Sequence, residues 1–453
     1  MRRLDGSSRR LLCWRRIVGR LRANAVLALF AAALVLRLLV VFLEPPTRPL
    51  GDEPAWLAVA DSVVAAGFDP LRADLIFYPP VYPYLIGLTA HAMGSLTATK
   101  VLQALLGALL VPVVARLGRM SFGAGVAVLA AAFVALSPVC AWYAAHFWAE
   151  PVFVLLLWFG IERVMAGDAT GRLLPIATGG FAIGLAALTR EPALYVLPLV
   201  AAWVALGRRK RSLLQAGLLL AVALLTVAPW TVRNYARYSA FVPVSTMGGR
   251  ALLEGNSDRD RGEVYAEYDE VGGEQGPIAQ HRFAMQEGLR AIRARQPTWL
   301  FEKLAQEVPH LLTADNMVLV HVRRRGYGQP TTLGIWLVAL VTVLPYLAVM
   351  GLFVLGLARL SWSRPAILLV GFLLVYTLLH VVVHGHHRFR LPMLPAIFLI
   401  AASAVPAAGA GLAPFTPRRR VLFAALALLL VAVLVPGFVG FAAEPAFFGA
   451  RAR

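Results

Sequence analysis

Apolar runs of about 15 to 25 residues recur along almost the whole chain, with short polar segments between them. Only a helix carries such a run through a bilayer with its backbone groups paired internally, because the hydrocarbon offers no water to an open strand. The pattern therefore predicts an all-α polytopic membrane protein with eleven spans. They lie at 23–43, 101–115, 124–140, 150–165, 173–188, 192–206, 213–228, 333–357, 366–383, 391–412 and 421–441.

A further apolar stretch, 81–94, is shorter than the ~17 to 20 residues that a spanning helix needs. Pro79, Pro80 and Pro83 surround its start, where proline is tolerated only in the first turn of a helix. We predict that this stretch lies in the membrane interface.

The basic residues predict the orientation of the chain. With the N-terminus inside, the short inner segments hold 21 Lys and Arg and the short outer segments hold eight. Cytoplasmic loops are enriched in these residues, so this orientation is favoured. If 81–94 crossed the bilayer, every later loop would invert and the run GRRKR at 207–211 would face outward.

This topology divides the chain into consecutive segments, and the central outer loop is expected to hold surface helices near 281–295 and 298–312. The segments are a basic cytoplasmic N-terminus (1–22), a transmembrane module (23–228) that includes a first outer loop (44–100), an extracytoplasmic loop region (229–332), C-terminal transmembrane helices (333–441) and a tail (442–453).

Composition supports the membrane assignment and limits the function classes. Of 453 residues, 59% are hydrophobic and only 15% are charged, which is too apolar for a soluble core. The net charge of +19 comes largely from basic residues in short loops, so we expect membrane lipids as partners and no nucleic acid. Two cysteines, Cys13 and Cys140, are too few for a disulfide framework or a thiolate metal site.

The predicted topology gathers polar residues from six separate segments at the outer side of the membrane. Ionisable groups at this depth are costly, so such a cluster marks a candidate site. A carboxylate can deprotonate an attacking hydroxyl and arginine binds phosphate through two hydrogen bonds, a combination that suits sugar transfer from a lipid phosphate. The cluster consists of Asp52, Glu53, Tyr78, Glu150, Arg190, Glu191, Arg233, Asn234, Arg388 and Arg390.

Each residue also has a structural interpretation. Asp52 or Glu53 could cap the helix that Pro54 begins, since acidic residues suit helix N-termini. Glu150 could mark the start of an interfacial helix, and Arg233 could anchor its helix among aromatic residues. The run HGHH at 384–387 offers metal-ligand residue types without a fixed spacing, so no metal ligand is assigned.

The order of the motifs resembles the GT-C glycosyltransferases of the family 39 type, which include protein O-mannosyltransferases and aminoarabinose transferases. The resemblance covers nearly the whole chain. Its motifs are GDEPAW, FYPPVYPYLIG, HFWAEPVFVLLL, GLAALTREPALYVLP, APWTVRNYARYSAFVPVSTMGGRALLEGN and HRFRLPMLPAIFL.

The resemblance implies a GT-C bundle of about 11 to 13 transmembrane helices with juxtamembrane helices in the first outer loop and a modest extracytoplasmic region. It implies Asp52 as the general base, Glu53 beside it in support, and Glu150 as the acidic residue of the second outer loop. It also implies a polyprenyl-phosphate sugar donor and an extracytoplasmic active site in the plasma membrane. No cofactor is certain, and a divalent metal is left open.

The chain departs from the lipid A transferases where they bind phosphate. It has Ala55 and Trp56 after the acidic pair and Tyr78 in place of a lysine, which disfavours aminoarabinose activity. The positive charge would then come from Arg233, Arg388, Arg390 or Lys100, with Tyr82 in the FYPPVYPYLIG motif also expected at the substrate.

We therefore expect an inverting membrane glycosyltransferase that moves a sugar from a polyprenyl-phosphate donor to a glycan, lipid or protein outside the cytoplasm. The alternative is a transporter or flippase of lipid-linked sugars. Transporters place their coupling charges near the bilayer midplane, whereas here the acidic residues lie at helix ends. A purely structural membrane protein is a third interpretation, and it leaves the outer charges unexplained.

Overall fold

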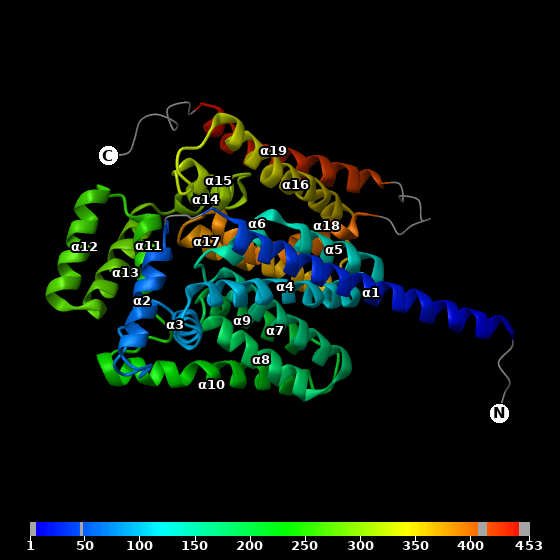
Figure 1. Ribbon diagram of the computed structural model, residues 1–453, viewed down its shortest axis with the longest axis horizontal. Helices are drawn as coiled ribbons and strands as arrows, with labels where there is room; N and C mark the ends of the chain where they lie inside the picture. Colours follow the sequence, from blue (N-terminus) through cyan, green and yellow to red (C-terminus); the bar gives the residue numbers. More distant parts are fainter. Residues whose placement is uncertain (1–5, 46–48, 406–414, 444–453) are drawn as a thin grey trace.

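The computed structural model describes residues 6–45, 49–405 and 415–443, without the side chains of residues 6–22, 261 and 435–443. Every regular element among the described residues is a helix, as predicted (Figure 1). Arg48, the tail beyond residue 443 and residues 406–412 of the tenth predicted span lie outside this description.

Each predicted span coincides with a helix or with a pair of helical segments. The main helices are α1 (Gly6–Leu43), α4 (Leu96–Ser121), α5 (Ala124–Leu136), α7 (Glu150–Thr170), α8 (Leu173–Ala187), α9 (Pro192–Ala205), α10 (Ser212–Tyr238), α16 (Thr332–Arg359), α17 (Arg364–Val382), α18 (Leu394–Ser403) and α19 (Pro417–Ala443). By length and composition, five helices in the described part of the chain could cross a membrane, or six if one bent pair is a single span. The expected number of eleven stays a prediction.

Two predicted spans are interrupted where proline removes a backbone N–H. In the third, α5 ends before Pro138, and the chain bends by 54° into α6 (Pro138–Trp142) and the 3-10 turn η1 (Tyr143–Ala145). In the tenth, Pro392 and Pro395 lie where a 3-10 segment, η2 (His387–Met393), leads into the ten residues of α18. Both irregular segments carry residues of the site described below.

The loops that the sequence predicts to lie outside are also helical. The first contains α2 (Glu53–Ala65) and α3 (Val81–Met93), close to the juxtamembrane helices expected there. The central loop contains α13 (Pro277–Ala294) and α14 (Trp299–Leu312) near the two expected positions, together with α11 (Met247–Asn256), α12 (Arg261–Gln275) and α15 (Met317–Arg323). In Figure 1, α2 and α11–α13 lie at the end of the molecule opposite to the start of α1.

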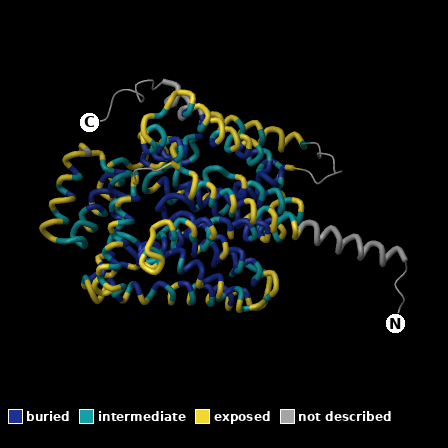
Figure 2. Tube along the Cα trace, in the orientation of Figure 1, coloured by how far each residue is buried: buried dark blue, intermediate teal, exposed yellow. Residues whose placement is uncertain are grey.

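The buried core lies where α4, α7, α8, α9, α17 and α18 meet (Figure 2). Helices α7 and α8 approach closely at Gly160 and Gly179. A Cβ atom added to Gly179 would lie 2.9 Å from the carbonyl oxygen of Gly160 and 2.6 Å from Val164. Small residues at such a crossing let two helix backbones pack directly, which is a common arrangement in membranes.

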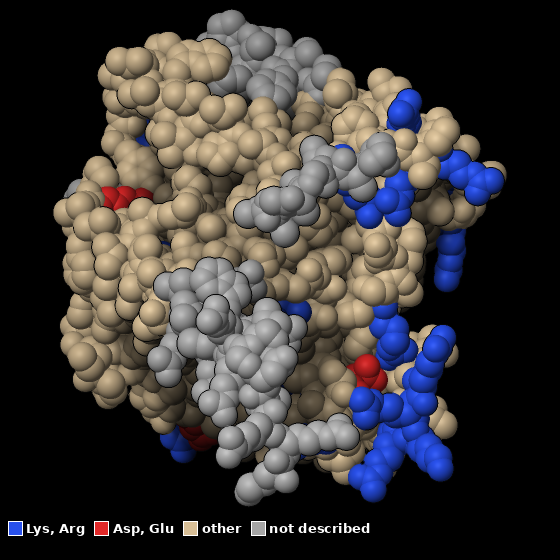
Figure 3. Space-filling view, turned by 90° about the vertical axis from the view of Figure 1, so that its right-hand side faces the viewer, with Lys and Arg blue, Asp and Glu red and all other residues tan. Residues whose placement is uncertain are grey.

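The end of the molecule that faces the viewer in Figure 3 gathers lysine and arginine with few acidic side chains. The C-terminal part of α4, the short connections α7–α8 and α9–α10 and the start of α19 carry exposed basic residues. These are Arg116, Arg119, Arg172, Arg208, Arg209, Lys210, Arg211, Arg418, Arg419 and Arg420. They belong to the segments that the positive-inside rule places at one side of the membrane.

Candidate active site

A glycine turn places the acidic pair at the start of α2. Gly51 has a φ of +65°, and a Cβ atom there would lie 2.9 Å from the ring of Trp148. This left-handed conformation favours glycine. Pro54 then stands in the first turn of α2, and Asp52 occupies the N-cap position without any capping hydrogen bond from its side chain. The capping interpretation of Asp52 is therefore wrong for its side chain, which points elsewhere.

Asp52 binds an arginine from the far end of the sequence. Its Oδ2 accepts a hydrogen bond of 2.6 Å from Nη1 of Arg388, which is in η2. Arg388 also lies 3.4 Å from Oε1 of Glu150, at the first residue of α7, and Arg190 forms an ion pair with the same oxygen. Two carboxylates, Asp52 at the start of α2 and Glu150 at the start of α7, thus face two arginines.

The arginines keep Asp52 ionised. Burial by itself would raise the pKa of this carboxyl, but the charge and hydrogen bond of Arg388, with contributions from Arg190 and Arg250, lower the pKa overall. The Asp52 side chain is 42% exposed, whereas that of Glu150 is 1% exposed. Of these two carboxylates, Asp52 is therefore the one that a substrate can reach, and Glu150 is the buried partner of the two arginines.

Asp52 and Arg388 line a cavity of about 1460 Å³. Its charged lining also includes Glu254 and the exposed Arg324. The α16 side is apolar, and four of its residues are more than half exposed at the surface of the helix: Trp336, Leu337, Leu340 and Leu344. The cavity therefore joins a charged region to an apolar surface.

The HGHH run forms part of the wall of this cavity. His384, His386 and His387 all line it, and Nδ1 of His386 accepts a hydrogen bond from the backbone N–H of Arg388. Burial, followed by the charge of Arg388, lowers the pKa of His386 to about 3. His386 is therefore a neutral imidazole that fixes the backbone of Arg388.

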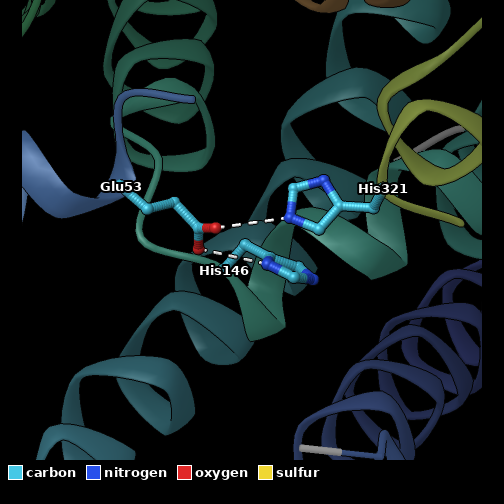
Figure 4. A group of neighbouring side chains, drawn as sticks. All are labelled: Glu53, His146 and His321. Atoms are coloured by element: carbon cyan, nitrogen blue, oxygen red, sulfur yellow. Dashed lines mark hydrogen bonds and ion pairs between the residues drawn. The ribbon is translucent and has the colours of Figure 1, made fainter. Parts of the chain in front are cut away.

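Glu53 is not among the residues that line the cavity, and its side chain points toward His146 and His321 (Figure 4). Its carboxylate accepts hydrogen bonds from the backbone N–H groups of Leu50 (3.0 Å) and Phe147 (2.9 Å). Nδ1 of His146 lies 3.1 Å from Oε1 and Nε2 of His321 lies 3.4 Å from Oε2. Burial would raise the pKa of Glu53, but the imidazoles and the Leu50 N–H lower it well below its usual range.

Three of the expected substrate-binding residues donate hydrogen bonds to protein groups. Arg233 donates to the carbonyl oxygens of Pro70 and Ala73, each at 2.6 Å, and to the side chain of Asn234. Asn234 donates to the carbonyl oxygens of residues 242 and 244. Arg390 donates to the carbonyl oxygens of residues 313 and 315. These hydrogen bonds connect neighbouring loops, and a role of the three residues in substrate binding stays a prediction.

The remaining expected residues lie around the site at different depths. The charge of Asp52 adds to burial in raising the pKa of Tyr78 to about 12, so Tyr78 is a neutral neighbour of Asp52. Tyr82 is fully buried, and its hydroxyl donates to Gln103 at 2.5 Å. The ammonium of Lys100 lies 5.3 Å from the centre of the Phe147 ring.

Sequence reasoning missed several residues that the structure brings to this region. His146 lies in the HFWAEP motif, four residues before Glu150, and that spacing was its only signal. Glu44 follows the first span and binds the other nitrogen of His146 at 2.9 Å. His321 and Arg324 lie on or just after the short helix α15, for which the sequence offered no periodic pattern long enough to recognise.

Comparison with known families supports the resemblance noted in the sequence. Residues 78–232 match the family model described as dolichyl-phosphate-mannose-protein mannosyltransferase. This match covers about one third of the chain and includes Tyr82, Glu150 and Arg190. In a sequence search, no curated protein matches the chain.

Solved structures match almost the whole chain. ArnT from Cupriavidus metallidurans, bound to undecaprenyl phosphate, has a TM-score of 0.54 at 16% identity, over 94% of this chain and 66% of that protein. The Archaeoglobus fulgidus oligosaccharyltransferase AglB, with an inhibitory peptide and a dolichol-phosphate, has 0.52 at 16% identity, over 94% and 56%. The same enzyme in complex with Zn and sulfate has 0.51 at 15% identity, over 94% and 52%.

The chain thus has the GT-C fold of these membrane glycosyltransferases, which confirms the expected fold class and the resemblance. It spans about half to two thirds of the length of the solved proteins that it matches.

Proposed function

We propose that the chain is a membrane glycosyltransferase that moves a sugar from a polyprenyl-phosphate donor to an acceptor outside the cytoplasm. The observation that carries this proposal is the pair of Asp52 and Arg388 in the wall of a cavity that continues onto the apolar face of α16. A polyprenyl-phosphate sugar has the matching form, with an anionic head and a long apolar tail. The solved GT-C proteins in complex with undecaprenyl phosphate and dolichol-phosphate support the same donor class.

In the proposed reaction, an acceptor hydroxyl attacks the anomeric carbon of the donor sugar. The bond from that carbon to the phosphate oxygen breaks, the polyprenyl phosphate leaves, and the hydroxyl proton passes to Asp52. Arginine has five N–H donors, and Arg388 uses only some of them on Asp52 and Glu150. The other donors, with the nearby Arg190 and Arg324, would neutralise the phosphate as it leaves. A single displacement of this kind inverts the anomeric centre.

Two parts of the proposal concern the setting of the reaction. The basic face in Figure 3 would lie at the cytoplasm, because inner loops are enriched in Lys and Arg. The protein would lie in the plasma membrane, with the cavity and the helices α11–α14 on its extracytoplasmic side. A glycan, lipid or protein on that side could serve as acceptor.

The test is a gene deletion complemented with wild-type chain or with Asp52→Asn. We expect mass spectrometry of envelope glycans and glycoproteins to show a lost hexose-sized or pentose-sized unit, restored by the wild type. Asp52→Asn should lower transfer by about 100-fold to 10,000-fold, the usual contribution of a general base. A matched control is Asp61→Asn, because Asp61 is exposed on the same helix.

If Asp52→Asn restores the lost sugar unit fully, and is present in the membrane in the same amount as the wild type, Asp52 is not the general base. The transporter alternative is tested with purified wild-type chain in liposomes that contain a labelled polyprenyl-phosphate sugar. Movement of the intact lipid between leaflets without covalent transfer would show that the protein is a flippase and not a glycosyltransferase.

A further inference from the structure

Glu53, His146 and His321 form a compact group of metal-ligand residue types from three distant parts of the chain (Figure 4). One ligand atom from each residue lies within 4.8 Å of the others. All three side chains are at most 3% exposed. None of them lines the cavity that holds Asp52 and Arg388, so this group is separate from the surface that a substrate would contact.

His321 is the unexplained member of the group. It is fully buried, and neither of its ring nitrogens has a hydrogen-bond partner among the residues that the structure describes. Its Nε2 points at the carboxylate of Glu53 from 3.4 Å, which is too far for a good hydrogen bond. Leaving a buried polar group without a partner costs about 1 to 3 kcal/mol. We therefore expect that Nε2 of His321 binds a ligand that is not part of the protein.

We propose that Glu53, His146 and His321 bind one divalent transition-metal ion of the zinc class. Two imidazoles and one carboxylate are a ligand set typical of Zn²⁺. Ligand atoms at about 2.0 to 2.1 Å from a tetrahedral zinc lie roughly 3.4 Å from one another. Nδ1 of His146 lies 3.1 Å from Oε1 of Glu53 and Nε2 of His321 lies 3.4 Å from Oε2, so each imidazole nitrogen is close to this distance from one carboxylate oxygen.

The surroundings of His146 resemble the support of a metal ligand. With Nδ1 directed at the site, Nε2 is left to donate to Glu44 at 2.9 Å. A carboxylate behind a ligating histidine fixes its tautomer and raises its basicity. Trp142 stacks on the imidazole with ring centres 3.8 Å apart, and Tyr327 donates to Glu44. The ring orientation of His146 is thus fixed before any ion binds.

The place of the site in the chain indicates what it does. It joins the start of α2, the segment after η1 and helix α15. Since Glu53 directly follows Asp52, a metal bond to Glu53 would hold the proposed base in position without contacting the substrate. This positioning role rests on the proposed function, whereas metal binding itself does not.

The simplest alternative to a bound metal ion is a proton on His146. A protonated His146 could bridge Glu44 and Glu53 and satisfy both carboxylates without a metal. That arrangement leaves His321 without a partner, whereas the metal engages it. Substitution of His321 therefore separates the two interpretations.

The experiment measures metal on the purified full-length chain in detergent. Elemental analysis should find about one zinc-class ion per chain, with an occupancy at least ten-fold lower in His321→Ala. After removal of the ion with a chelator, added Co²⁺ should give visible absorption bands typical of nitrogen and oxygen ligands in a low-coordinate site, and His321→Ala should lack them. Glu44→Gln should weaken Co²⁺ affinity by about 10-fold to 100-fold, the usual effect of losing such support.

His310→Ala is the matched control, because His310 lies in the neighbouring helix α14 with a side chain 69% exposed. It should keep the metal and the cobalt spectrum. If His321→Ala does not fold, His321→Gln serves in its place, since glutamine fills the space without an imidazole. The inference is overturned if the wild type holds no metal and gives no cobalt spectrum, or if the folded His321 variants bind as the wild type does.

Failure of this inference is distinguishable from failure of the proposed function. Asp52→Asn should keep full metal occupancy while losing transfer. Wild-type chain that transfers sugar but neither holds a metal nor gives a cobalt spectrum would refute the site alone. Chain that binds metal but transfers no sugar in the complementation test would refute the function alone.

Discussion

At the scale of single residues, the adjacent side chains of Asp52 and Glu53 lie in two different environments. At the start of α2, Asp52 turns to the cavity and Arg388, whereas Glu53 turns to His146 and His321. Asp52 is half exposed and Glu53 is buried. The exposed carboxylate can accept a proton from a substrate, and the buried one serves the structure around it.

Another residue-scale pair fixes the wall of the cavity. Lys303 is 1% exposed, and its ammonium donates to Glu307 and to the carbonyl oxygens of Gly255 and Val383. Glu307 also accepts the backbone N–H of Gly385 at 2.6 Å. The pair thus ties α14 to the end of α11 and to the start of the HGHH run.

We predict that Glu307→Gln lowers the stability of the protein by about 3 to 5 kcal/mol, because it leaves the ammonium of Lys303 buried without its counter-ion. The measurement is the midpoint of thermal unfolding in detergent. Glu302→Gln, at an exposed position one turn earlier, should change the midpoint little. The double variant Lys303→Met/Glu307→Leu should recover most of the loss, and a Glu307→Gln midpoint equal to that of wild type would contradict the prediction.

The same pair predicts a pH dependence. Burial would raise the pKa of Glu307, but the imidazole of His310, 3.7 Å away, and hydrogen bonds from Lys303 and Gly385 lower it from 4.5 to about 2. A carboxyl with a depressed pKa in the folded state stabilises the protein above its unfolded pKa and loses this contribution as the pH falls. Wild type should therefore lose stability between about pH 4.5 and 2, and Glu307→Gln should lose less over the same window.

At the scale of elements, close packing of helices depends on a few small residues, and breaks in helices position the site. The bend at Pro138 ends the third apolar run early, so that the segment around His146 is buried beside the start of α7 instead of continuing as a helix. The 3-10 segment η2 likewise presents Arg388 to the cavity.

The α7–α8 contact gives a prediction at this scale. Gly179→Ala should lower stability by about 1 to 3 kcal/mol, because its new methyl group would meet Val164 and the backbone of Gly160. Gly217→Ala in α10 is the control, since nothing lies within 4 Å of the added atom and alanine favours a helix. Thermal unfolding in detergent measures both, and equal midpoints would show that α7 and α8 can separate without cost.

At the scale of the whole molecule, the basic face and the helices α2 and α11–α13 lie at opposite ends (Figures 1 and 3). This separation suits an enzyme that takes a lipid-linked donor from the bilayer and acts at one surface only. The long apolar helices between the two ends have many exposed leucines and valines, as lipid-facing surfaces do.

The orientation can be tested with cysteine labelling in a background where Cys13 and Cys140 are serine. In intact cells, a membrane-impermeant maleimide should label Glu274→Cys at the end of α12 and should not label Lys210→Cys in the GRRKR run. Both should react after the membrane is opened. Labelling of Lys210→Cys in intact cells would contradict the predicted orientation, because it would mean that the cavity faces the cytoplasm.

The sequence by itself determined the class of fold and the position of most helices. Long apolar runs have no stable alternative to helices in a bilayer, and the basic loops predicted one orientation. It also singled out Asp52, Glu150, Arg190 and Arg388, because charges at membrane depth are rare enough to stand out.

The tertiary structure alone decided which of these charges meet. Arg233, Arg388 and Arg390 are equivalent in sequence, since each is a basic residue near the end of an apolar run. Only packing shows that Arg388 reaches Asp52 while the other two donate to backbone carbonyls. The group of Glu53, His146 and His321 could not be predicted from the sequence either. Side-chain direction and contacts between segments more than 90 residues apart depend on the whole fold.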